Sequence, residues 1–96
     1  MFDSGAKSSE VAPRFDLIPY EAQRREAERW GEGAKGHGEN NWKRGINDPV
    51  FRKDRLNHLL VHVTKWADGD RSDDHLAAAR CNLAMLIWFE EMDGRS

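Results

Sequence analysis

The chain has 96 residues, 39% of them hydrophobic and 33% charged, which is the length and composition of one globular domain. A chain this short buries only roughly 60–65% of the surface that its unfolded form exposes, so we expect a partner, as in a homo-oligomer. The net charge is −2 and basic residues are interleaved with acidic ones, a pattern that gives no support for direct nucleic-acid binding.

The apolar stretches indicate a protein with no membrane partner. The longest one, Leu76–Phe89, is interrupted by Arg80 and Asn82 and is shorter than the roughly 18 residues that a membrane span needs. The N-terminus lacks the apolar core of a signal peptide, and the single cysteine, Cys81, is typical of a small buried side chain in a reducing compartment. We therefore expect a cytoplasmic protein.

The first third of the chain predicts a tail and one helix. Residues 1–12 have little apolar content, which predicts a mobile tail followed by a single helical domain over 13–96. Pro19 favours the start of a helix, and we place this helix at about Pro19–Gly33. Its charged flank, with Glu28 among its members, is either one wall of a pocket or an ordinary solvated face.

A long glycine-rich loop is expected next, over about residues 31–46, because five glycines and an Asn-Asn pair occur there. A loop of that length in a compact domain is usually functional. Trp42 lies within it and needs a surface to pack against, which is either the domain core or a nucleobase.

The second helix is predicted over Pro49–Ala67, with Asp48 as its N-cap. Apolar residues recur along it with the period of one helix face, and they are Leu56, Leu59, Leu60, Val63 and Ala67. His58 and His62 lie on one side at the edge of this stripe, either as metal ligands or phosphate contacts, or as a structural pair.

The third helix is predicted from a cap at Ser72 to about Met92. It is apolar almost all round, which marks the central helix of a bundle or one that also faces a second subunit. His75 and Asn82 share one side of it, separated by small residues, and a buried Asn82 needs a neighbour, a water or a ligand as its partner.

These elements predict an all-α fold, a small helical bundle of three main helices with a long Gly-rich loop between the first two, completed by oligomerisation. We find no strand alternation and no internal repeat. A helical bundle builds its ligand sites from inward-facing polar residues on adjacent helices, so one shared pocket is expected to collect the polar residues of all three.

Several short motifs, in order along the chain, resemble the phage dATP/dGTP diphosphohydrolase family over about residues 14–92. In the first half they are Arg14–Pro19, Ala27-Glu28 followed by Gly33–Lys35, and Asn41–Gly45. In the second half they are His62, Gly69-Asp70, Asp74–Ala79 and Asn82.

The resemblance implies an enzyme of phage nucleotide metabolism in the host bacterial cytoplasm. The family is similar in chemistry to the all-α nucleotide pyrophosphohydrolases, which use a divalent metal to cleave a nucleoside triphosphate to the monophosphate and pyrophosphate. Those enzymes usually carry an ExxE motif and a later ExxD motif. This chain departs from that pattern, because Glu28 and Glu32 are four apart and the third helix offers Asp73, Asp74, His75 and Asn82 instead.

Roles for individual residues follow from this implied chemistry, in which carboxylates hold Mg²⁺ (or Mn²⁺) against the triphosphate. The expected metal ligands are Glu28, Glu32 and Asp74. The expected catalytic residues are Glu28, His62 and His75. The expected contacts to the nucleotide substrate are Lys35, Asn41, Trp42, His58 and Asn82.

Two other functions fit the same sequence. One is a non-catalytic module of the same fold that binds a nucleotide or a host protein, which the small set of candidate acidic ligands and the dense apolar surface of the third helix favour. The other is a structural or assembly protein whose four tryptophans serve only packing and interfaces.

Overall fold

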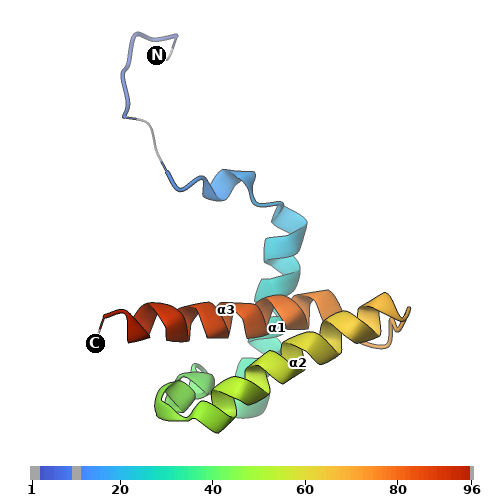
Figure 1. The fold of residues 1–96 in the computed structure, drawn as a ribbon. Helices are drawn as coiled ribbons and strands as arrows, with labels where there is room; N and C mark the ends of the chain where they lie inside the picture. Colours follow the sequence, from blue (N-terminus) through green and yellow to red (C-terminus); the bar gives the residue numbers. More distant parts are fainter. Residues whose placement is uncertain (1–2, 10–11, 96) are drawn as a thin grey trace.

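The computed structural model describes residues 3–9 and 12–95, and within these ranges the chain is all-α and contains no strand. A short 3-10 helix, η1 (Phe15–Leu17), precedes α1 (Tyr20–His37), and a second one, η2 (Asn41–Asn47), leads into α2 (Pro49–Ala67) and α3 (His75–Asp93). Figure 1 shows α2 and α3 running antiparallel, with α1 crossing them. No helix in the described part of the chain combines the length and apolar character needed to cross a bilayer.

The predicted tail, residues 1–12, is only partly within the described ranges, because residues 1–2 and 10–11 lie outside them. Residues 3–9 form neither helix nor strand. The mobility of this segment stays a prediction.

The predicted bounds of α2 are confirmed. Asp48 caps the helix, since its Oδ1 accepts hydrogen bonds from the backbone N–H groups of Val50 and Phe51 at 3.1 Å each, and Pro49 is the first helical residue. The helix ends at Ala67, and Gly69 then takes the left-handed conformation at φ 89° that turns the chain toward α3.

The predicted start of α3 is wrong by two residues. Asp74 is the N-cap, and its side chain accepts from the backbone N–H of Ala77 at 3.2 Å. Ser72 instead donates its backbone N–H and its hydroxyl to Asp70 Oδ1, at 2.8 and 2.6 Å. Both residue types are good caps, and the one nearer the first buried turn of α3 takes the role.

The long glycine-rich loop is also wrong. Gly31, Gly33 and Gly36 all lie inside α1, which continues to His37, and the remainder of the predicted loop is residues 38–40 followed by η2. A glycine in a helix costs only about 1 kcal/mol relative to alanine, and the intervening Glu, Ala and Lys residues are strong helix formers. Packing of Trp30 and Ala34, both half-buried, therefore outweighs the glycines and keeps this segment helical.

The helix α3 is the centre of the bundle, as predicted. Of the described residues that are buried, all but Gly45 lie on it: His75, Ala77, Ala78, Ala79, Cys81, Asn82 and Phe89. The small residues occupy its first half, where α1 crosses it, and Phe89 occupies the second half.

A cluster of aromatic rings joins α1, η2, the start of α2 and the second half of α3. The ring of Trp42 lies 5.6 Å from that of Trp30, 5.2 Å from that of Trp88 and 5.7 Å from that of Phe89. Phe51 closes the cluster against Phe89 at 6.4 Å. Trp42 therefore packs in the domain core, which is one of its two predicted environments.

The apolar stripe of α2 does not face this core. The exposed fractions of Leu56, Leu60 and Val63 are 45%, 55% and 44%. The side of α2 that contacts α3 instead carries Phe51 and His62, about a third of a turn away on the helix. An apolar stripe at helical spacing does not by itself say which surface will cover it.

A substitution at Gly45 tests the packing of η2 against α2. A Cβ at this buried position would lie 2.2 Å from Cδ1 of Phe51, so Gly45→Ala forces the ring or the backbone to move. We expect a loss of about 1–3 kcal/mol in the free energy of unfolding, measured by urea denaturation.

Gly31→Ala is the matched control, because a Cβ there has no heavy atom within 4 Å and the position is helical. It should be neutral or stabilise the chain by up to about 1 kcal/mol. Equal effects of the two substitutions would contradict the packing described here.

Candidate functional site

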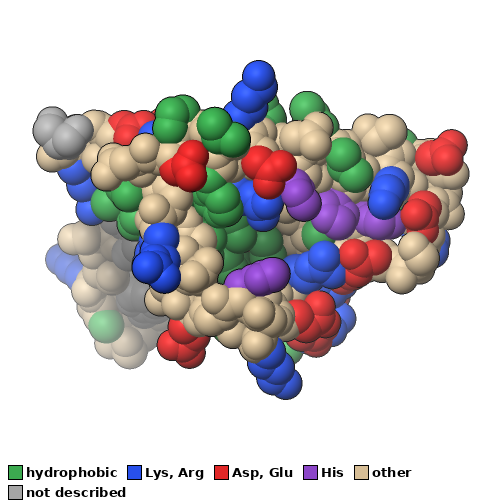
Figure 2. Space-filling view, turned by 90° about the horizontal axis from the view of Figure 1, so that it is seen from below, with side chains coloured by type: hydrophobic (Ala, Val, Ile, Leu, Met, Phe, Trp, Pro, Cys, Tyr) green, Lys and Arg blue, Asp and Glu red, His purple; other side chains and the backbone are tan. Residues whose placement is uncertain are grey.

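A hollow of about 790 Å³ lies between α1, the end of α2 and the start of α3. Its lining is mostly charged and consists of Arg25, Glu28, Arg29, Glu32, Trp66, Arg71, Ser72, Asp73, Asp74, His75 and Leu76. Figure 2 shows histidine side chains grouped with acidic and basic ones on one face of the molecule. Such a collection of opposite charges suits a charged ligand better than an apolar one.

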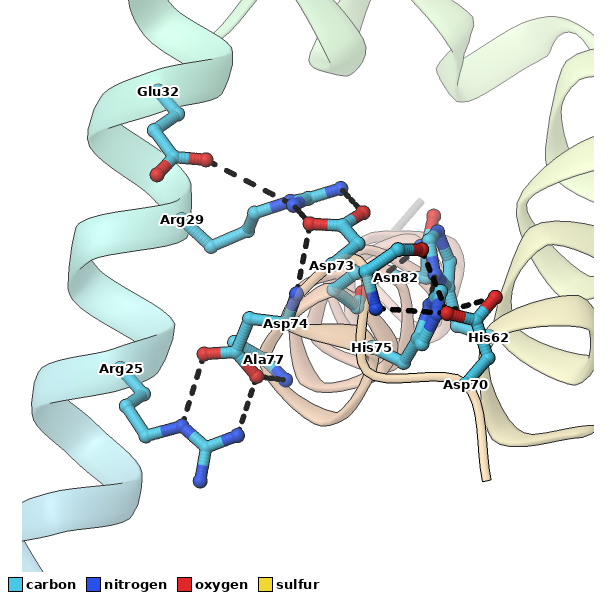
Figure 3. Close-up of polar contacts among 12 residues, drawn as sticks. Arg25, Arg29, Glu32, His62, Asp70, Asp73, Asp74, His75, Ala77 and Asn82 are labelled. Carbon is cyan, nitrogen blue, oxygen red and sulfur yellow. Dashed lines mark hydrogen bonds and ion pairs between the residues drawn. The ribbon is translucent and has the colours of Figure 1, made fainter. Parts of the chain in front are cut away.

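Two arginine–aspartate pairs connect α1 to the residues that precede α3 (Figure 3). Arg25 makes a two-point contact with Asp74, with Nε 2.9 Å from Oδ2. Arg29 makes a second two-point contact with Asp73, at 2.6 and 3.1 Å. Because Arg25 and Arg29 are one helical turn apart, they meet two consecutive aspartates.

These pairs keep both aspartates ionised. The Arg25 guanidinium holds the pKa of Asp74 below its ordinary value, and the Arg29 guanidinium does the same for Asp73. Hydrogen bonds from Ser72 lower the pKa of the nearby Asp70 to about 2. The entrance to α3 therefore carries three carboxylates that are ionised at neutral pH.

Two histidines meet behind these carboxylates. His62 Nδ1 on α2 lies 2.9 Å from His75 Nδ1 on α3, so one nitrogen donates a hydrogen bond and the other accepts it. His75 is buried, and its Nε2 lies 3.4 Å from Asp70 Oδ2. Burial is the main cause that lowers the pKa of His62, which favours the neutral ring at physiological pH.

The structure brings five of the predicted site residues to this place. Glu28, Glu32, Asp74 and His75 line the hollow, and His62 contacts His75. Glu28 accepts from Arg24 at 2.8 Å, and a carboxylate oxygen of Glu32 lies 3.8 Å from Arg29 Nη1. Both glutamates are exposed on the same side of α1.

The other predicted residues lie outside the lining: Lys35, Asn41, Trp42, His58 and Asn82. Trp42 belongs to the aromatic core, and His58 lies on the exposed side of α2, 3.4 Å from Asp54. Asn82 is buried, and its Nδ2 donates to the carbonyl of Ala78 at 2.9 Å, while its Oδ1 has no hydrogen bond within the described residues.

The sequence analysis missed the arginines of the site. Arg25, Arg29 and Arg71 line the hollow, together with Trp66, whose ring lies 4.8 Å from the Arg71 guanidinium carbon. The sequence does show two arginines four residues apart and two consecutive aspartates. Only the crossing of α1 over the start of α3 shows that they pair with one another.

A model of the family described as dATP/dGTP diphosphohydrolase, N-terminal, matches residues 3–95. The chain belongs to this family. The match confirms the resemblance predicted from the motifs and extends it to nearly the whole chain. Searches of curated proteins and of solved structures give no significant match.

The thiol of this family member is not part of the hollow. Cys81 is buried on the side of α3 that faces α1, where its Sγ lies 3.6 Å from the carbonyl oxygen of Glu26. Burial raises the pKa of the Cys81 thiol to about 12. A protonated, enclosed thiol is a packing group and not a nucleophile.

We expect Cys81 to react very slowly with an aromatic disulfide reagent while the chain is folded, because at about pH 8 the thiolate fraction is on the order of 10⁻⁴. In urea the reaction should become fast and consume one thiol per chain. The rates are measured by absorbance, with Cys81→Ser as the blank. Similar rates in folded and unfolded protein would contradict this placement.

Proposed function

We propose that the hollow binds a purine deoxynucleoside triphosphate together with Mg²⁺ or Mn²⁺ and that the domain hydrolyses it to the monophosphate and pyrophosphate. The observation that supports this most directly is the composition of its lining, in which three arginines and four carboxylates surround an open, charged space. Membership of the dATP/dGTP diphosphohydrolase family supports the choice of substrate.

The charge of the lining requires a cation alongside the nucleotide. Three arginines face four carboxylates there, so the arginines do not outnumber the acidic groups of the lining. A triphosphate adds several more negative charges. A divalent cation held by oxygen ligands is the ordinary way to balance such a site.

The carboxylates fit such a cation in their chemistry. Glu28 and Glu32 are one helical turn apart on α1, and Asp74 lies at the start of α3 across the same hollow. Mg²⁺ held by these carboxylates would neutralise phosphate charge and supply the Lewis acidity that activates water for attack on phosphorus. Arg25 and Arg29 pair with carboxylates in this structure. On nucleotide binding they would exchange those carboxylates for phosphate oxygens, so each guanidinium is paired both before and after binding.

The remaining residues divide the other tasks. Arg25 and Arg29 bind phosphate, since a planar guanidinium makes two-point contacts with phosphate as it does with carboxylate. His75, with His62 behind it, takes or gives the proton of the attacking water. Trp66, 41% exposed and at the edge of the hollow, offers a stacking surface for the base, because Trp42 is already engaged in the core.

The test is a hydrolysis assay on the full chain with each of the four deoxynucleoside triphosphates and Mg²⁺ or Mn²⁺. We expect pyrophosphate from dATP and dGTP, and a loss on the order of 10²-fold in Glu28→Gln. Glu21→Gln is the matched control, because Glu21 lies on α1 outside the lining and should keep full activity. Pyrophosphate release that does not differ between the two variants contradicts the proposal.

A domain that binds without turnover is the second candidate, and the engagement of Asp73 and Asp74 by arginine favours it. Thermal unfolding separates the two cases. A nucleotide at about 100 times its Kd should stabilise the chain by about 2.7 kcal/mol, whether or not it is hydrolysed. Stabilisation by nucleotide and metal without pyrophosphate would favour the binding module, and no stabilisation would exclude both.

We further propose that a second copy of this chain covers the apolar stripe of α2, Leu56, Leu60, Val63 and Ala67. The chain exposes 7645 Å², against about 5,700 Å² for a folded monomer of this mass. The N-terminal segment accounts for part of the excess. An interface of standard size removes roughly 800 Å² per partner, which this excess can supply.

Leu60→Glu should raise the dissociation constant of the dimer by about tenfold or more, because the substitution places a charge within the covered stripe. Sedimentation velocity over a range of concentrations measures this. Val61→Glu is the control, since Val61 is similarly exposed but lies off the stripe. A wild-type chain that stays monomeric at high concentration would exclude the dimer.

A further inference from the structure

We propose that His62, Asp73 and His75 form a binding site for a transition-metal cation such as Zn²⁺, separate from the three carboxylates proposed above for Mg²⁺, which are Glu28, Glu32 and Asp74. Each residue offers one ligand atom, and these atoms all lie within 4.8 Å of one another. Among the described residues, this is the group of three that meets the spacing of a metal site. It is a site for binding that does not depend on hydrolysis, and an ion held here would occupy the His62 and His75 nitrogens proposed above for proton transfer.

The distances between the nitrogens suit a small ion. In tetrahedral zinc sites the metal–nitrogen bonds are about 2.0–2.1 Å, which places neighbouring ligand atoms about 3.3 Å apart. His62 Nδ1 and His75 Nδ1 are 2.9 Å apart, so the rings need to separate by only a few tenths of an ångström. A metal ion then takes the place of the proton that the two nitrogens share.

A carboxylate behind His75 completes the arrangement that orients a histidine ligand. His75 is 3% exposed, and its Nε2 is buried without a well-formed hydrogen bond, 3.4 Å from Asp70 Oδ2. Asp70 is itself held by Ser72. Ligand histidines almost always direct their second ring nitrogen to such a carboxylate, which fixes the proton there and leaves the other nitrogen bare.

Asp73 supplies the third ligand by changing partners. Its two oxygens now accept from Arg29, at 2.6 and 3.1 Å (Figure 3). Coordination by one oxygen weakens this pair and leaves part of the Arg29 guanidinium free in the hollow, which Arg29, Asp73 and His75 all line. Three protein ligands leave one coordination position for water or for a phosphate oxygen.

The ligand types select the metal. Two imidazole nitrogens and one carboxylate favour Zn²⁺, Co²⁺ or Ni²⁺, whereas Mg²⁺ prefers oxygen ligands throughout. The site therefore differs in its metal from the carboxylates proposed for Mg²⁺, and the two can be titrated separately.

The test titrates the full chain, made without a polyhistidine tag, with Zn²⁺ by calorimetry and with Co²⁺ by visible absorption, in the absence of nucleotide. We expect one equivalent to bind, with the intense bands of tetrahedral Co²⁺. His62→Gln and Asp73→Asn should abolish those bands, and Asp70→Asn should weaken binding by about 10–100-fold. Circular dichroism confirms that each variant is helical.

His58→Gln is the matched control. His58 lies four residues before His62 on α2, so the two histidines form the alternative surface pair for a metal, and their rings are 6.5 Å apart. The proposed site predicts that this variant binds as the unsubstituted chain does. No cobalt bands in the unsubstituted chain, or an equal loss in His58→Gln and His62→Gln, would overturn the proposal.

Discussion

The close approach of α1 to the first half of α3 is the contact on which the rest of the structure depends. Ala77, Ala78 and Ala79 are all buried in this half of α3, where α1 and α2 both pack against it, and Cys81 on the same helix lies against Glu26 of α1. Exposed or half-exposed ion pairs contribute at most about 1 kcal/mol each, so the two arginine–aspartate pairs do not hold the helices together by themselves. Packing fixes the helices, and the pairs then fix how charge is distributed in the hollow.

Asp74 serves two structural purposes at this contact. Its carboxylate caps α3 through the N–H of Ala77 and pairs with Arg25 on α1. A cap of this kind contributes about 1 kcal/mol to helix stability. A metal ion that draws Asp74 away from either partner therefore loosens the start of α3, and ligand binding and helix stability are linked at one residue.

The features that were predictable from the sequence were those set by nearby residues. Asp48-Pro49 determined where α2 begins, and the apolar run after His75 identified the central helix. The prediction of a glycine-rich loop was wrong because tertiary packing outweighed the weak preference of glycine against a helix. The arginines were missed because their partners lie 44 and 49 residues away, and only the crossing of α1 brings them together.

The apolar stripe of α2 predicted the helix correctly and did not say which surface covers it. Leu56, Leu60 and Val63 follow the helical period, but the period is the same whether α3 or another chain covers them. His62 was placed at the edge of that stripe, and the structure turns this edge toward His75. The apolar pattern of α2 thus predicts which residues share one side of the helix. The packing of α2 against α3 determines where that side lies in the folded chain.

The glycines inside α1 make the two sides of the hollow, α1 and the start of α3, differ in how easily they open locally. A Cβ at Gly31, Gly33 or Gly36 would meet no heavy atom within 4 Å, so in this half of α1 the packing rests on Trp30 and Ala34 and not on the glycine positions. Local opening of such a segment needs far less free energy than global unfolding, and its amide protons exchange correspondingly faster. Glu32 is carried by this yielding half, whereas Asp74 is anchored at the capped start of α3. A ligand bound between Glu32 and Asp74 would therefore meet a fixed side at α3, and a side at α1 that can adjust to the length of the ligand.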